Sequence, residues 1–149
     1  MPSTVEASEE FAVSAPLERV WAFFTDLSNV GSCIPGCEGV NVIDRDTASF
    51  KVRVKVGYIS RSFEIKARFK EVVEPTHVTF FGEGSDAEIS GNLDFAQTSG
   101  AVAIRYRIEI RPVSVMGKTS IAMIGKDLVK KQASEFASCV KSKLEQAGT

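Results

Sequence analysis

The residue types that could do chemistry by themselves are scarce in this chain of 149 residues. It has three cysteines and one histidine, and two of the cysteines enclose a short turn in the run CIPGC, residues 33–37. Structural zinc usually has four Cys or His ligands at short paired spacings, and Cys33 and Cys37 are one residue too far apart for CxxC. With only Cys139 and His77 to complete a site, we expect no metal, no disulfide framework and two plain thiols beside a Pro-Gly turn.

Polar residues on the predicted buried faces give little further evidence of a catalytic site. Alternation places Glu9 on the inner face of its strand unless a bulge turns it outward. Tyr106 is inward on the last strand, either as a core aromatic with a local hydrogen bond or as a donor to a ligand carbonyl. His77 follows a Pro-Thr turn, so we expect it to be exposed. No nucleophile–base set or paired carboxylates emerge, so catalysis is the less favoured interpretation.

Composition and charge exclude several classes of protein. The chain is 44% hydrophobic and 25% charged, which is typical of a globular protein, and its formal net charge is −1, unlike a dedicated nucleic-acid binder. No apolar run approaches the length of a membrane span. The first ten residues contain three glutamates and lack the features of a signal peptide. We expect one cytoplasmic domain spanning residues 1–149.

The N-terminal third predicts a strand followed by two short helices. Residues 5–14 read as a strand, and Pro16 stands where a helix can begin, followed by apolar residues at helical spacing as far as Phe24. Residues 26–32 predict a second helix with Asp26 as its N-cap. The CIPGC run then falls between this helix and a strand at residues 39–43.

The rest of the chain predicts a sheet and one long helix. Apolar and polar residues alternate along five further strands, which are residues 48–56, 63–69, 78–82, 87–95 and 102–110. Residues 118–147 have helical periodicity. The fold class is therefore α+β, with a seven-stranded antiparallel sheet curled around a long C-terminal helix and two short helices after the first strand. This arrangement is the helix-grip.

Several runs also carry a family resemblance. They are VWAFFTDLSNVGSCIPGCEGV at residues 20–40, KVRVKVGYISRSFE, FGEGSDAEISGNLDF and the terminal helix. The chain resembles the family of carbon monoxide dehydrogenase G subunits, within the START-like (polyketide cyclase/SRPBCC) helix-grip superfamily. The resemblance implies a fold that binds hydrophobic ligands, and an accessory role for a molybdenum-dependent carbon monoxide dehydrogenase or a related hydroxylase. It implies no cofactor, and it makes CIPGC a turn kept for its shape.

Small residues among the large inward ones favour a ligand cavity between sheet and helix, although they would also allow close helix packing. Gly91 and Gly125 are costly in a strand and a helix, so we expect them to make room. The predicted lining comprises Phe50, Val52, Phe63, Ile65, Phe80, Ile89, Gly91, Leu93, Ile104, Tyr106, Gly125, Val129 and Phe136.

Basic residues gather on the outward face of the predicted sheet. A solvated face is the ordinary explanation, but such a cluster could also dock an acidic protein or anionic lipid heads. The candidates for a partner surface are Lys51, Arg53, Lys55, Lys66, Arg68 and Lys70, and Arg105, Arg107 and Arg111 share their outward parity.

Three functions are therefore open. The favoured one is a non-catalytic accessory protein that holds a lipid-like or quinone-like molecule and meets dehydrogenase subunits, assembly factors or the inner face of a membrane. The second is a cyclase- or hydratase-type enzyme that uses Tyr106 or Glu9 on an apolar substrate in the same cavity. The third is an interaction domain with a filled core that acts through its basic face.

Overall fold

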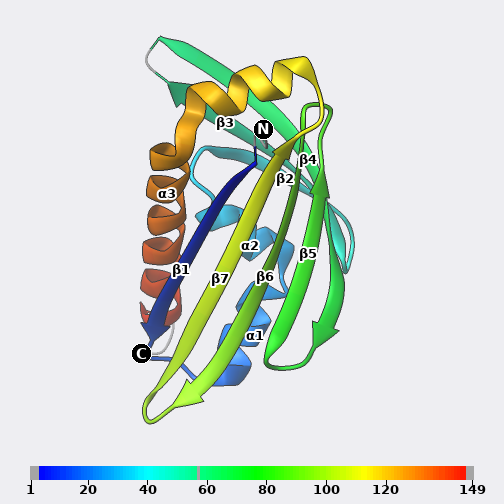
Figure 1. Ribbon diagram of the computed structural model, residues 1–149. Coiled ribbons are helices and arrows are strands. Elements are labelled where there is room, and N and C mark those ends of the chain that lie inside the picture. Colours follow the sequence, from blue (N-terminus) through cyan, green and yellow to red (C-terminus); the bar gives the residue numbers. More distant parts are fainter. Residues whose placement is uncertain (1–3, 57, 147–149) are drawn as a thin grey trace.

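A seven-stranded antiparallel sheet curls beside the C-terminal helix in the described residues (Figure 1). The computed structural model describes residues 4–56 and 58–146. The strand order is β1-β7-β6-β5-β4-β3-β2. The strands are β1 (Val5–Val13), β2 (Cys37–Asp44), β3 (Thr47–Val56), β4 (Ile59–Val73), β5 (His77–Glu83), β6 (Ala87–Thr98) and β7 (Ala101–Pro112). The predicted fold class is confirmed, while β4 is much longer than the predicted strand over residues 63–69.

Two short helices, α1 (Leu17–Phe24) and α2 (Leu27–Cys33), follow β1 as predicted. Pro16 precedes α1 with an extended backbone, which suits its fixed φ. The side chain of Asp26 accepts hydrogen bonds from the N–H groups of Ser28 and Asn29, at 3.0 and 3.3 Å. This is the N-cap that the sequence predicts, because the first N–H groups of a helix have no partner inside it.

The long helix α3 (Val115–Gln146) is two helical arms joined at Gly125. Gly125 has φ +72° and ψ 167°, a conformation that L-residues rarely adopt and glycine adopts readily. The second arm lies alongside β1, and the first arm turns across the end of the sheet (Figure 1). The prediction of one continuous helix over residues 118–147 is therefore wrong at this point. The glycine bends the helix, and a Cβ added to it would meet nothing within 4 Å.

The strand β2 pairs with β3 irregularly. The register shifts between Cys37 and Gly39 and again between Val42 and Asp44. Only residues 39–42 pair in an unbroken run between the two shifts. Such irregularities bend a strand locally and interrupt its hydrogen-bond ladder.

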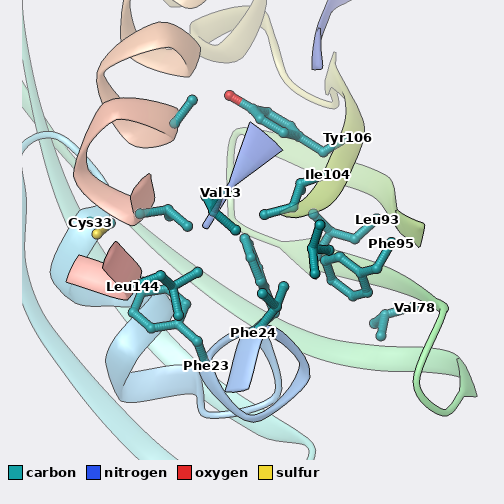
Figure 2. Packing of buried hydrophobic residues seen from close by; sticks show 14 of the residues in the cluster. Val13, Phe23, Phe24, Cys33, Val78, Leu93, Phe95, Ile104, Tyr106 and Leu144 are labelled. Atoms are coloured by element: carbon teal, nitrogen blue, oxygen red, sulfur yellow. The ribbon is translucent and has the colours of Figure 1, made fainter. Parts of the chain in front are cut away.

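The core is packed where α1 and the second arm of α3 meet β1, β6 and β7. Phe24 is 1% exposed, and its ring lies 5.2 Å from that of Phe95 and 6.3 Å from that of Phe136. Figure 2 shows Phe24 among Val13, Ile104, Phe95 and other apolar side chains. Trp21 meets Phe95 edge to face at 6.0 Å. Trp21 and Phe24 thus fasten α1 to the fold, as their spacing in the sequence suggests.

A disulfide joins Cys33, at the end of α2, to Cys139 in the second arm of α3. The two Cα atoms are 5.4 Å apart, within the range that a disulfide spans. Cys37 is the free cysteine. The expectation of unpaired thiols is wrong for Cys33 and Cys139, because the fold brings together two residues 106 positions apart.

Candidate functional site

An apolar band crosses the inner face of the sheet beside the packed core. Val52 lies opposite Phe63 in the β3–β4 register, and Ile89 lies opposite Ile110 in the β6–β7 register. Between these pairs, Ile65 extends over Gly82 of β5, which has no side chain of its own. These five large side chains, which we call the inner band, are each only partly buried. Phe63, Ile65 and Ile89 belong to neither of the two packed core clusters.

The other large side chains of the predicted lining lie in the packed core or against it. Phe50, Leu93, Ile104, Tyr106 and Val129 are buried. The partly buried ring of Phe136 packs against Tyr106 at 5.7 Å. The structure therefore divides the predicted lining into a filled half and the inner band.

Gly91 does not make room for a ligand. A Cβ at this position would lie 2.4 Å from Cζ of Phe80 and 2.7 Å from the backbone oxygen of Arg107. The ring of Phe80 occupies the space that the sequence argument assigned to a cavity. That steric expectation is wrong, because a cross-strand neighbour fills the position.

Gly91→Ala should destabilise the protein by about 1–3 kcal/mol, because the new methyl group meets a ring and a backbone oxygen. Chemical denaturation measures the loss. Gly39→Ala is the matched control, since a Cβ there meets nothing within 4 Å. Phe80→Leu in the Gly91→Ala background should recover part of the loss. A Gly91→Ala protein as stable as the parent would contradict the packing described.

Tyr106 and Glu9 face each other across the β1–β7 pair on the inner side of the sheet. The Tyr106 hydroxyl donates a hydrogen bond to the backbone oxygen of Ala133 in α3. Figure 2 shows this hydroxyl pointing toward the helix. Burial, and then the charge of Glu9, raise the pKa of this hydroxyl well above its ordinary value. Glu9 is partly buried, so the unbroken register turns it inward as alternation predicts. The hydroxyl proton of Tyr106 is therefore engaged in a hydrogen bond that links β7 to α3.

A groove of about 450 Å³ lies between the margin of the sheet and the second arm of α3. One wall comes from the CIPGC turn and β3, and the other from one face of the helix. The lining residues are Gly36, Cys37, Glu38, Arg53, Lys55, Leu128, Lys131, Gln132 and Glu135. Sequence reasoning singled out the turn but assigned none of the helix residues to a site, although their spacing of three and four marks a second stripe beside the core-facing one.

A family model that describes the G subunits of carbon monoxide dehydrogenase (CoxG) matches residues 10–145. The chain belongs to this family. The match spans the CIPGC turn, the sheet except the first part of β1, and nearly all of α3, so the resemblance noted in the sequence is confirmed. No curated protein matches the chain significantly.

Solved structures show the fold of this CoxG-family chain. A conserved protein from Geobacillus kaustophilus has a TM-score of 0.75 at 17% identity, covering 98% of this chain and 97% of its own. A START superfamily protein from Mycobacterium smegmatis has a TM-score of 0.72 at 12% identity, with coverages of 95% and 98%. The Zhui aromatase/cyclase from Streptomyces sp. R1128 has a TM-score of 0.71 at 11% identity, with coverages of 96% and 94%. The fold is the START-like helix-grip.

Ion pairs divide the predicted basic face of this CoxG-family chain into a paired part on β7 and a largely unpaired part on β3 and β4. On β7, Arg105 pairs with Glu10 at 3.2 Å, Arg107 with Glu6 at 2.6 Å, and Arg111 with a glutamate of β6. The hydrogen bond from Arg107 lowers the pKa of Glu6.

On β3 and β4 most cations are unpaired. Arg53 pairs with Glu38 at 2.9 Å, and this contact lowers the pKa of the carboxyl. Lys70 lies over the ring of Phe81 at 5.2 Å. Within residues 4–56 and 58–146, no ion pair involves Lys51, Lys55, Lys66, Arg68 or Lys70. In the described residues, the cations of the predicted partner surface are therefore not neutralised by ion pairs, except at Arg53.

His77 is held between two carboxylates and is not exposed as expected. It begins β5, where its Nδ1 lies 2.7 Å from Asp94 and its Nε2 3.1 Å from Glu71. The hydrogen bond to Asp94, with the charges of Asp94 and Glu71, raises the pKa of His77 although burial opposes this. The β5–β6 register places His77 opposite Asp94. This register could not be predicted from the sequence alone.

This raised pKa predicts a pH-dependent stability. The protonated form is stabilised in the folded state, so its contribution is complete below the ordinary histidine pKa of about 6.5 and is lost as pH rises through the folded value. We expect urea stability to fall between about pH 6.5 and the folded pKa. His77→Gln should remove the slope in this window. A slope of the opposite sign, or one unchanged in the variant, would refute the assignment.

Proposed function

We propose that this chain is a non-catalytic accessory protein of a carbon monoxide dehydrogenase-type molybdenum hydroxylase, and that it holds a lipid-like or quinone-like molecule between sheet and α3. Membership of the CoxG family supports the association with such an enzyme. The observation that carries the ligand proposal is the inner band, because Phe63, Ile65 and Ile89 lie outside the packed core and remain partly exposed. Covering apolar area of this kind is favourable at about 25 cal/mol per Å².

Native mass spectrometry of protein purified from its own host tests the ligand proposal. We expect a co-purified apolar molecule, and uptake of a short-chain naphthoquinone or a fatty alcohol by the emptied protein. Phe63→Gln should weaken uptake, since it sets an amide in the inner band. Val42→Gln is the control, because Val42 is 49% exposed on β2. Binding of neither probe, with no co-purified molecule, would reject the carrier function.

The enzyme alternative draws on the fold shared with an aromatase/cyclase. A cyclase or hydratase needs a free proton donor near an acid, and the Tyr106 hydroxyl is instead bonded to Ala133. In the residues described, no helix is both long and apolar enough to cross a membrane. We therefore favour a carrier that meets its partners through a surface.

The partner surface we propose is the unpaired basic face of β3 and β4, and the partner is an acidic face of the dehydrogenase or its assembly factors. Reversing Lys51, Lys66 and Arg68 together to glutamate should leave the melting temperature nearly unchanged and abolish pull-down of the partner at low salt. Reversing Arg105 and Arg107, which are already paired, tests whether position matters beyond charge. Binding that survives the first reversal rejects the surface, and loss of binding to anionic vesicles alone assigns it to a membrane.

A further inference from the structure

The burial of the inner face changes along the strands. On β7 the inward side chains of Ile104 and Tyr106 are buried, whereas that of Ile110 is only partly buried. On β3 Phe50 is buried and Val52 is partly buried. On both strands burial falls toward the end of the sheet that the first arm of α3 crosses (Figure 1). The packed core fills the other end, so a ligand on the inner band can extend toward the core only until it meets a core side chain.

On β5, Phe80 is the first inward side chain that a ligand meets on its way toward the core. Gly84 and Gly82, the two inward positions before it, have no side chain, and Ile65 of the inner band extends over both. The β5–β6 register places Gly82 opposite Ile89, and Phe80 lies two residues further along the same face. Two residues of a strand span about 6.6 Å, so the Phe80 ring directly follows the inner band.

The ring of Phe80 is held by both neighbouring strands. On β6 it lies over Gly91, where an added Cβ would be 2.4 Å from its Cζ and 2.9 Å from its Cε1. On β4 its cross-strand partner is Phe69, which packs against both core clusters. Phe80 itself is partly buried and packs against the larger cluster. Because a close-packed interior resists displacement of its side chains, this ring forms a wall between the inner band and the core.

The path from the open end of the sheet to Phe80 suits a hydrocarbon chain. From Gly84 to Phe80 it covers four residues, or about 13 Å, which is the length of about ten extended methylene groups. A polar group on this path would lose its hydration without gaining a hydrogen bond, so the polar head of a ligand belongs at the open end. The inward residues along the path are all apolar in the described part of the chain, and they are Phe63, Ile65, Gly82, Gly84 and Ile89.

We infer that Phe80 sets the length of the molecule that this protein carries. The alkyl chain of the ligand lies on the inner band with its end against the Phe80 ring, and its polar head lies at the open end of the sheet. This inference rests on the proposed carrier function and names the residue that selects among ligands. Each methylene group buried ahead of the ring strengthens binding about threefold to fourfold. A methylene group beyond this limit stays in water and adds nothing.

The test measures the binding of even-numbered alcohols from octan-1-ol to hexadecan-1-ol, by displacement of the fluorescent probe N-phenyl-1-naphthylamine. In the parent we expect affinity to rise with length and then to level off at one alcohol, which defines the limit. Phe80→Ala leaves a cavity at the end of the path, so the next longer alcohol should bind about tenfold more tightly than the one at the limit. Phe80→Leu leaves a smaller cavity and costs less stability, and it should give about a threefold gain.

Phe81→Ala is the matched control for these variants. Phe81 follows Phe80 on β5 and lies on the outer face, where Lys70 covers its ring at 5.2 Å. The limit should therefore stay at its parent value in this control. A limit unchanged in both Phe80 variants, or an affinity that rises through hexadecan-1-ol in the parent, overturns the inference while leaving the carrier function intact. A parent that binds none of these alcohols overturns both.

Discussion

Replacing Phe24 with alanine should lower the free energy of unfolding by about 3–5 kcal/mol, among the largest effects of any single substitution in this chain. The side chain is 1% exposed and touches aromatic rings from three parts of the fold, α1, β6 and α3. Removing the ring leaves a cavity that these neighbours cannot close together, because each belongs to a different element. Urea denaturation followed by circular dichroism measures the change.

The control for Phe24 is Val115→Ala, because Val115 is 82% exposed at the start of α3. Exposed substitutions of this kind usually change stability by less than about 0.5 kcal/mol. A loss below about 1 kcal/mol for Phe24→Ala would show that the ring lines a space able to collapse or exchange its contents. The packed half of the fold would then have to be reconsidered as part of the ligand site.

Reduction of the Cys33–Cys139 disulfide should cost about 2–5 kcal/mol. The bond closes a loop across a separation of 106 residues, and constraint of the unfolded chain grows with loop length. The comparison is between oxidised and reduced protein in a Cys37→Ser background, which removes the free thiol that could exchange. Denaturation midpoints with and without a dithiol reductant give the difference.

The Cys139→Ser variant is the second comparison in this experiment. Its stability should resemble that of the reduced parent and should not respond to the reductant. Mass spectrometry without reduction should show the Cys33–Cys139 peptide pair in the parent. A parent whose stability ignores the reductant and whose thiols all react with a labelling reagent would show that the bond does not form.

Local patterns in the sequence determine most of the fold. Alternation of apolar residues on β3 and β7, and the capping carboxylate of Asp26, act over a few positions and can be read directly. The bend at Gly125 could not be read, because a glycine within a helical pattern is also compatible with an unbroken helix. The disulfide, the His77–Asp94 contact and the Phe80 ring over Gly91 all join residues that only the sheet register or the helix position brings together.

In the candidate site, too, local patterns were predictable and contacts between distant residues were not. The inner band consists of residues whose inward parity was predicted, but their incomplete burial depends on where α3 lies. The groove is less predictable still, since Lys55 was assigned to the outer face and the only signal for Lys131 is its spacing from the other helix residues of the groove. Its two walls meet because the sheet margin at the CIPGC turn ends beside the second arm of α3.

The two register shifts in β2 also have a consequence for self-association. An edge strand of a sheet can pair with a strand of another molecule when it presents a long regular row of unpaired N–H and C=O groups. Here the regular row is limited to residues 39–42, four positions between two irregularities. The exposed side chains of Val42 and Ile43, each about half exposed, would otherwise suit an intermolecular sheet. The irregular edge thus protects the protein from edge-to-edge aggregation, and changes that regularise β2 should make it prone to form fibrils.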